Sequence, residues 1–193
     1  MVELSRRERK KKETYENLLK SAMELFRRQG YEQTTVEQIT QLADVGKGTF
    51  YNYFPTKEAV ILEYSRRKYE ELIISGREAS YSLKERLNHV LKNWALFMTC
   101  ERELVWVAVR NRDGAEIDKG LHYGLIGILS HGQRVGEISK DYDPVFLAES
   151  LEGMVIQHFM HWYYTGEGNL DREMERILSL FFDGLGEKKL KAF

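Results

Sequence analysis

The side chains best suited to chemistry lie between residues 47 and 53, where polar donors and aromatic rings follow one another closely. Lys47 and Asn52 carry hydrogen-bond donors, and Tyr51 and Tyr53 carry hydroxyl groups on aromatic rings. Side chains of these types can bind phosphate oxygens and the edges of nucleic-acid bases. The segment is therefore a candidate nucleic-acid contact, provided that the surrounding elements turn it toward solvent.

Two short helices joined by a tight turn are expected to position these side chains. Residues 34–43 place apolar side chains at three- and four-residue spacing, and Thr34 with Glu37 forms a capping-box pattern at the start. Gly46 in the turn can take a positive φ, and Gly48 lets the backbone approach a neighbouring surface. This pattern predicts a helix-turn-helix.

The second short helix is expected to end at Pro55, after Phe50 and Phe54 have anchored it to a core. A longer helix then runs from Lys57 to about Gly76. At about 1.5 Å per residue it measures about 30 Å, enough to link a small amino-terminal domain to a larger one. The predicted division places residues 1–56 in the first domain and residues 57–193 in the second.

The amino-terminal residues also match a known family pattern. The matching motifs are Ala22-x-x-Leu25-Phe26-x-x-x-Gly30-Tyr31, Thr34-Thr35-Val36-x-x-Ile39 and Gly48-Thr49-Phe50-Tyr51-x-Tyr53-Phe54-x-x-Lys57-Glu58. Over roughly its first 65 residues the chain resembles the amino-terminal domain of TetR-family transcriptional regulators. The rest resembles the family in helical character and length.

The resemblance implies a set of DNA contacts and partners. The implied phosphate contacts are Thr35, Tyr53 and Lys57, and the implied contacts nearest the base edges are Lys47, Gly48, Thr49, Tyr51 and Asn52. The implied partners are a double-stranded DNA operator, a second copy bound through the last two long helices, and a small-molecule effector held in the second domain. Three positions depart from the family pattern: Asp44 replaces its usual Gly, Gly46 its usual Ser, and Thr40 its usual Ala.

Composition predicts an all-α fold. The chain has 193 residues, 42% of them hydrophobic, and only two prolines, so a substantial core and helix nearly throughout are expected. Its single cysteine, Cys100, excludes an internal disulfide framework, and no run is apolar enough for a secretion signal or a bilayer span. A cytoplasmic location is expected, with no membrane partner.

Charge is distributed unevenly along the chain. Residues 1–57 hold 11 Lys and Arg against 8 Asp and Glu, whereas residues 58–193 hold 18 against 22. The densest cationic run, residues 6–12, is interrupted only by Glu8. Two interpretations stay open for this run: a solvated, frayed arm, or a segment that contacts phosphates or the minor groove.

The second domain is expected to contain helices from about 82 to 98, 104 to 110, 115 to 132, 145 to 165 and 171 to 184. Ser82 with Glu85 forms a capping box, and Asp143 precedes a proline at the first helical position. Gly120, Gly124 and Gly127 form either a flat strip for close helix contact or a weak stretch of helix. The last two helices carry more apolar residues than one narrow stripe requires, which agrees with the dimerisation that the resemblance implies.

Aromatic and Met side chains of the second domain suit an apolar cavity between helices, although plain core packing is the alternative for each of them. The candidate ligand contacts are Trp94, Phe97, Met98, Trp106, Tyr123, Met154, His158, His161 and Trp162. His158 and His161 share a helical face but lack a third metal ligand at fixed spacing, and Cys100 lacks a recognisable base. No metal, cofactor or catalytic residue is predicted.

The sequence therefore predicts a DNA-binding regulator, not an enzyme. The leading hypothesis is a repressor released from a palindromic operator by a small, largely apolar or aromatic ligand. An activator or a corepressor-dependent regulator would share every DNA-facing feature. A carrier or enzyme that uses the aromatic cavity, with a vestigial amino-terminal motif, is the alternative from another class.

Overall fold

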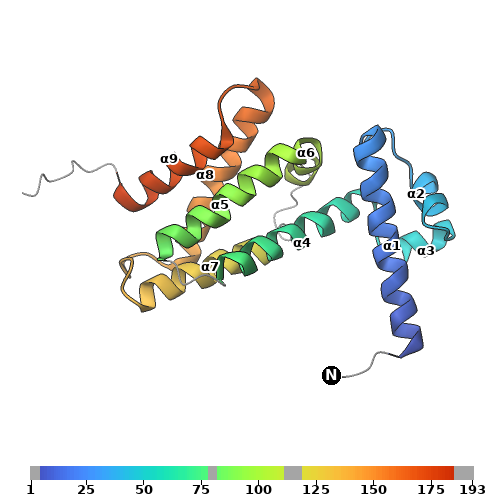
Figure 1. Ribbon diagram of the computed structural model, residues 1–193, viewed down its shortest axis with the longest axis horizontal. Helices are drawn as coiled ribbons and strands as arrows, with labels where there is room; N and C mark the ends of the chain where they lie inside the picture. The colour runs from blue at the N-terminus through green and yellow to red at the C-terminus, as the bar shows by residue number, and fades with distance from the viewer. Residues whose placement is uncertain (1–4, 78–81, 111–118, 185–193) are drawn as a thin grey trace, which may run out of the picture. The chain divides into compact units, whose positions relative to one another are not determined.

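The computed structural model describes residues 5–77, 82–110 and 119–184, and every regular element in these ranges is an α-helix (Figure 1). The helices are α1 (Arg6–Gln29), α2 (Val36–Leu42), α3 (Lys47–Tyr51), α4 (Lys57–Arg77), α5 (Leu83–Cys100), α6 (Arg102–Arg110), α7 (Lys119–Arg134), α8 (Pro144–Thr165) and α9 (Leu170–Asp183). The predicted all-α class is confirmed. Within the described ranges, no helix combines the length and apolarity that a bilayer span requires.

The described residues fall into two compact units. The amino-terminal unit contains residues 5–65 and 103–110, and the carboxy-terminal unit contains residues 66–77, 82–102 and 119–184. Helices α4 and α6 therefore have residues in both units. The sequence-based boundary after residue 56 differs from this division, because the first turns of α4 and most of α6 pack with α1 to α3.

The core of the amino-terminal unit forms where apolar faces of five helices meet. Its buried members include Leu18, Ala22 and Phe26 from α1, Ile39 from α2, Phe50 from α3, Ile61 from α4, and Leu104 and Val107 from α6. Helix α1 ends at Gly30, whose φ of 85° suits glycine. The apolar spacing of the sequence predicts a helix from about Lys10 to Gln29. The helix begins earlier, at Arg6, so the described cationic run is helical and not a frayed arm.

Helix α2 begins one residue later than the capping pattern predicted. The Thr35 side chain accepts from the Gln38 amide, and the Gln38 side chain accepts in turn from the Thr35 amide. Thr34 is buried instead, and its hydroxyl donates to the Gly30 carbonyl at 2.8 Å. The predicted Thr34–Glu37 capping box was therefore wrong. Thr34 and Thr35 are adjacent, and because Thr34 is buried, Thr35 caps the helix.

The turn before α3 also differs from expectation. Gly46, predicted to supply a positive φ, has a φ of −72°, whereas Asp44 adopts a φ of 53°. Asp44 is the only described residue other than glycine with a positive φ. The departure from the family's glycine at position 44 thus places a side chain where the backbone is left-handed.

Four helices of the carboxy-terminal unit form a closed ring: α5 packs on α7 and α9, and α8 also packs on α7 and α9. The second half of α4 joins them through close contacts at glycines. A Cβ atom added at Gly124 would lie 2.4 Å from Ile73, and one added at Gly76 would lie 2.8 Å from Val90. The predicted close contact is thus confirmed at Gly124.

The predicted helix starts in this unit are confirmed where the chain is described. Ser82 and Glu85 form the capping box of α5, and the Asp143 side chain accepts from the Val145 amide with Pro144 in the first turn of α8. Helix α7 begins at Lys119, and the predicted start at residue 115 lies outside the described residues.

Candidate nucleic-acid interface

Helix α3 presents one side to the core and the opposite side to solvent. Phe50 is fully buried, while Lys47, Gly48, Tyr51 and Asn52 are exposed. Because Lys47 and Tyr51 are four residues apart, as are Gly48 and Asn52, the exposed set occupies one face of a single short helix. This face, defined by residues 47, 48, 51 and 52, is called the reading face below.

Gly48 leaves the reading face open at the backbone. A Cβ atom added there, or at Gly46, would meet no atom within 4 Å. Packing within the described chain therefore does not require glycine at position 48, although glycine weakens a helix by about 1 kcal/mol relative to alanine. A bare backbone at this position suits close approach by an outside surface.

Lys47 is held by a neighbour on α2. Its ammonium forms an ion pair with Glu37, and both side chains are more than half exposed. The hydrogen bond from Lys47 lowers the pKa of the Glu37 carboxyl, and the same bond raises the pKa of Lys47. Lys47 therefore stays charged at the reading face, where Glu37 orients its side chain.

The flanking candidates differ in accessibility. Thr35, the cap of α2, is exposed, and Thr49 is half-buried. Tyr53 is also half-buried, with its ring 5.9 Å from the ring of Tyr15. The exposed side chains of α3 and Thr35 thus belong to the same unit, whereas part of the Tyr53 side chain packs against Tyr15.

Lys57 is engaged within the unit. Its ammonium donates to the carbonyls of Tyr31 at 2.7 Å and Thr34 at 2.9 Å, and it lies 4.0 Å from the centre of the Tyr31 ring. An ammonium has three hydrogens, so a phosphate would receive at most the third while these bonds persist. The lysine thereby ties the first turn of α4 to the loop that precedes α2.

Tyr31 and Glu58 form a hydrogen-bonded pair that the sequence did not predict, although both residues belong to the motifs shared with the family. The Tyr31 hydroxyl donates to the Glu58 carboxylate. Burial, followed by this bond, raises the pKa of Tyr31 well above its ordinary range. Burial also acts to raise the pKa of Glu58, but the bond from Tyr31 and further bonds from the backbone and Thr56 lower it overall.

The candidate ligand contacts do not gather in one place. Trp94, Phe97 and Met98 are buried on α5, where the Tyr69 ring meets Trp94 at 5.8 Å and Phe97 at 5.6 Å, edge to face. The Trp94 ring nitrogen Nε1 is buried and has no hydrogen-bond partner among the described residues. An unpaired buried donor is uncommon in folded proteins.

The remaining candidates lie elsewhere. Trp106 belongs to the amino-terminal unit, Tyr123 is 62% exposed, and Met154 is half-buried on α8. His158 and His161 line an open hollow of about 330 Å³ between the end of α8 and the start of α9, together with Trp162.

Two of the residues along that hollow already have neighbours within the unit. Trp162 lies 5.1 Å from the Arg102 guanidinium, and His158 lies 3.4 Å from Glu173. The spacing of residues in the sequence could not show which candidate ligand contacts are buried and which are exposed, because all of them lie in segments with helical periodicity.

Comparison with known proteins bears directly on this arrangement. The profile of the family described as bacterial regulatory proteins, tetR family, matches residues 18–64, which include α2, α3 and the reading face. The crystal structure of Thermus thermophilus FadR, a TetR-family transcriptional repressor in complex with lauroyl-CoA, is 27% identical and superposes with a TM-score of 0.82, covering 93% of this chain and 98% of that one. The chain belongs to the TetR family. It is therefore a DNA-binding transcriptional regulator with a helical ligand-binding domain.

Other transcriptional regulators match over different lengths. The fatty acid metabolism regulator protein of Bacillus subtilis is 25% identical over 93% of this chain and the whole of its own length. TcmR of Streptomyces glaucescens is 48% identical over 29% of this chain, a match that spans a quarter of its own length. Bacillus subtilis FadR in complex with stearoyl-CoA, 23% identical with a TM-score of 0.69, covers 89% of this chain and all of that one, and shares the fold.

Proposed function

We propose that this TetR-family protein is a homodimeric repressor that leaves a palindromic operator when a long-chain acyl-CoA binds to its carboxy-terminal unit. The observation that carries the proposal is the similarity to Thermus thermophilus FadR with lauroyl-CoA over nearly the whole of both chains. The name of the Bacillus subtilis relative, a fatty acid metabolism regulator, points to the same ligand class.

The DNA-binding half of the proposal is supported by the reading face. Lys47 and Asn52 supply donors, Tyr51 is 49% exposed, and Gly48 lets the backbone come close. Lys47, Gly48, Thr49, Tyr51 and Asn52 are assigned to the base edges, and Thr35, Tyr53 and Lys57 to phosphates. A dimer would place two such faces about one helical repeat, roughly 34 Å, apart on the same side of a duplex.

A second copy would cover an apolar face that α8 leaves exposed. Phe146 and Tyr164 are more than half exposed, and Met160 is half-buried. Together with Gly153, these residues are spaced by seven, seven and four along α8 and so share one face. A Cβ atom added at Gly153 would meet nothing within 4 Å. Glycine in the middle of an exposed helix is costly, and close approach by a partner helix gives a reason for it.

The ligand half is supported by the composition of the carboxy-terminal unit. The buried cluster of Tyr69, Trp94, Phe97 and Met98 is largely apolar, as the surroundings of a buried acyl chain must be. The unpaired Trp94 Nε1 supplies a donor to which an acyl carbonyl oxygen can bind. The proposed ligand is thus an acyl chain in an aromatic interior, with its polar end toward solvent.

Helix α6 is the proposed route from ligand to DNA. Its Leu104 and Val107 are buried in the core of the amino-terminal unit, and Arg110 pairs with Glu32, between α1 and α2, at 2.9 Å. At its other end, Arg102 follows α5 after one residue and donates to the Tyr163 carbonyl at 2.5 Å. A ligand that prefers a different position of α5 or α8 would therefore act on the DNA-binding unit through α6. Release requires tighter ligand binding to the conformation that does not bind the operator.

The test begins with selection of genomic fragments by the purified protein, followed by a fluorescence anisotropy titration of the recovered site with and without lauroyl-CoA. We expect a palindromic site and an affinity that falls at least about tenfold with ligand, a coupling of about 1.4 kcal/mol or more. Tighter DNA binding with lauroyl-CoA would establish a corepressor instead. Acyl-CoA binding by a protein that selects no fragment would favour a carrier.

A further inference from the structure

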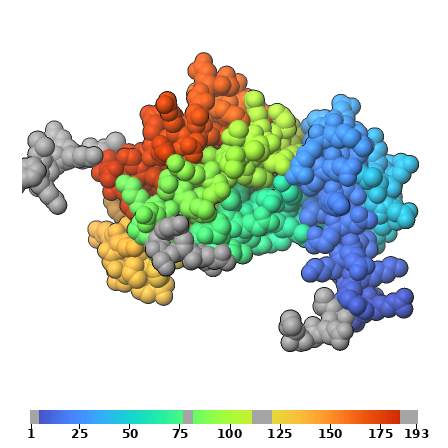
Figure 2. Space-filling model, viewed as in Figure 1, coloured from blue at the N-terminus to red at the C-terminus, as the bar shows by residue number. Residues whose placement is uncertain are grey.

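The first turns of α1 form a cationic helix that lies outside the core. Residues 6–12 carry six cations, Arg6, Arg7, Arg9, Lys10, Lys11 and Lys12, with Glu8 as the only acid, and all seven side chains are exposed. The first buried residue of α1 is Leu18. In Figure 2 this end of α1 projects beyond the rest of the amino-terminal unit. Residues 6–12 are called the basic projection below.

The basic projection is helical although the electrostatic interactions among its charges, and with the helix dipole, are unfavourable. Cations in the first turn oppose the helix dipole, and like charges three or four residues apart, such as Arg6 and Lys10, repel one another. The helix is nevertheless well started, because the Ser5 side chain and the Glu8 carboxylate form a capping box. The hydrogen bonds from Ser5 also lower the pKa of Glu8, so this acid is ionised at neutral pH.

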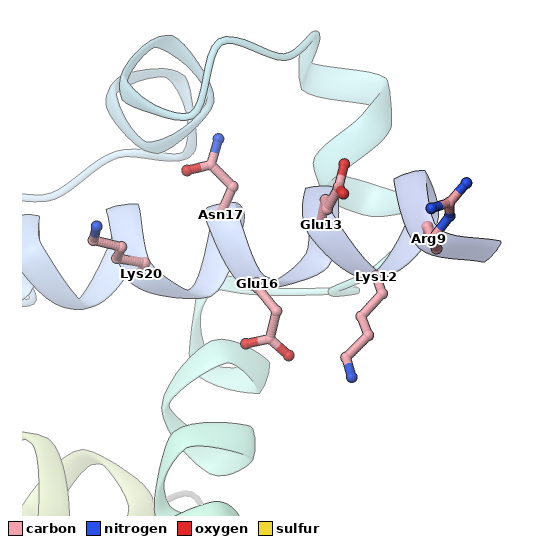
Figure 3. A pocket seen from close by; sticks show the side chains of 6 residues that line it. All are labelled: Arg9, Lys12, Glu13, Glu16, Asn17 and Lys20. Atoms are coloured by element: carbon pink, nitrogen blue, oxygen red, sulfur yellow. The ribbon is translucent and has the colours of Figure 1, made fainter. Parts of the chain in front are cut away.

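None of the six cations forms an ion pair with any residue in the described ranges, whereas Lys47, Lys92 and Arg110 all do. Figure 3 shows the Arg9 and Lys12 side chains extending away from α1. Among the described residues, these six cations on a capped helix repel one another without an ion pair to offset the repulsion. A local arrangement that opposes folding and has no internal compensation indicates an external partner.

The position of the projection identifies that partner. Helix α1 touches the reading elements just beyond it: Asn17 donates to the Ala43 carbonyl at 2.9 Å, and the Tyr15 ring stacks on Phe54 at 5.0 Å. From Tyr15 back to Arg9 the helix measures about 9 Å, within reach of flexible Arg and Lys side chains. The projection thus continues directly from the part of α1 that packs on the end of α2 and on the residues after α3, and its charge complements the phosphate backbone.

We infer that the basic projection binds backbone phosphates of the operator duplex outside the bases that α3 reads, so that the footprint of each subunit extends beyond its half-site. The inference rests on the proposed DNA-binding function and adds a second contact region to it. Such contacts strengthen binding to every sequence alike and fix orientation, without reading bases. Duplex DNA is the proposed occupant.

The test compares three full-length variants with the wild type on the selected operator. In the first variant all six cations are replaced by Gln. In the matched control each Arg becomes Lys and each Lys becomes Arg, which keeps the charge. A location control carries Arg134→Gln, Lys140→Gln and Arg172→Gln, three exposed cations of the carboxy-terminal unit. Anisotropy titrations between about 50 and 200 mM salt give the salt slope, and hydroxyl-radical footprinting gives the protected length.

We expect the six-Gln variant to lose about two to four units of salt slope for the dimer and at least about tenfold in affinity near 0.1 M salt. Its preference among operator variants should be unchanged, and its footprint should shorten at both ends. The charge-preserving and location controls should match the wild type. Circular dichroism should show no loss of helix, because Gln at these positions removes repulsion.

An unchanged salt slope and footprint in the six-Gln variant, with a wild type that binds the operator, would overturn the inference and leave the proposed function standing. Loss of binding to anionic phospholipid vesicles without loss of duplex binding would overturn it in favour of a membrane surface. A wild type that binds no duplex at all would instead defeat the proposed function. These outcomes separate the two claims.

Discussion

At the scale of single residues, Asp44 is the clearest case of a local conformation at odds with its side chain. Its φ of 53° suits glycine, and Asp tolerates it better than most residues do. We predict that Asp44→Gly raises the free energy of unfolding by up to about 1 kcal/mol, whereas Asp44→Ala lowers it by about 1 kcal/mol. Urea denaturation of the three proteins measures both changes. Equal stability of the Gly and Ala variants would show that this turn is not strained.

The Tyr31–Glu58 hydrogen bond predicts a defined pH dependence. The folded-state pKa of Glu58 lies below its ordinary value of 4.5, so the carboxylate contributes stability above about pH 4.5. That contribution is lost as the pH falls through the folded-state pKa. We expect Glu58→Gln to cost about 1 kcal/mol at pH 7 and less at pH 3.5.

The measurement is urea unfolding of the wild type and Glu58→Gln at both pH values. Other carboxylates titrate in the same range, and the difference between the two proteins removes their common effect. Tyr31→Phe serves as the matched control, because it removes the donor and keeps the acid. If Glu58→Gln lowers the free energy of unfolding by as much at pH 3.5 as at pH 7, the ionised Glu58 carboxylate is not the source of the stabilisation.

At the scale of elements, Gly48 separates the demands of folding from those of binding. Alanine there meets no atom of the described chain, and a helix gains about 0.5 to 1 kcal/mol from Gly→Ala. We predict that Gly48→Ala leaves the protein at least as stable but weakens operator binding by about tenfold or more, because the methyl group intrudes on the reading face. Thermal unfolding and anisotropy titration, run side by side, make the test. A variant with full affinity would mean that the backbone does not approach DNA at residue 48.

Element boundaries show what periodicity can and cannot predict. The capping boxes, Pro144 and the apolar spacing identified most of the helices that the structure describes, because each signal depends on residues within one turn of the helix end. The starts of α1 and α2 were misplaced. At Thr34 and Thr35 two adjacent residues offered the same cap, and only burial against Gly30 distinguished them. Tertiary packing decided the choice, which no local pattern records.

At the scale of the whole molecule, dimerisation is the property on which operator recognition depends. Gly153→Arg places a long charged side chain on the exposed face of α8, where the described chain leaves open space. We therefore expect a folded protein whose mass by analytical ultracentrifugation falls to one subunit. Operator affinity should fall with it, since one reading face loses the second half-site. Val135→Arg, an exposed substitution on the loop after α7, is the control. A Gly153→Arg protein that stays dimeric would show that this face is not the interface.

The candidate sites were predictable to different degrees. The reading face was recoverable from residues 47–52, because a helix-turn-helix fixes the outward side of its second helix through local packing alone. The burial of the candidate ligand contacts was not predictable in this way. Trp94 and Tyr123 both lie on apolar helices, yet one is 2% exposed and the other 62%. Which face of a helix points inward depends on neighbours that are distant in sequence, and the composition of the helix does not identify those neighbours.

Binding of the selected operator by wild type and Asn52→Ala tests the central claim most directly. Titrations should use the operator and a set of single base-pair variants across each half-site. We predict tight binding by the wild type, and for Asn52→Ala a loss of about 1 to 3 kcal/mol of discrimination at one position in each half-site, with the same salt slope. A wild type without sequence preference, or an Asn52→Ala protein that ranks every variant as the wild type does, would contradict the account.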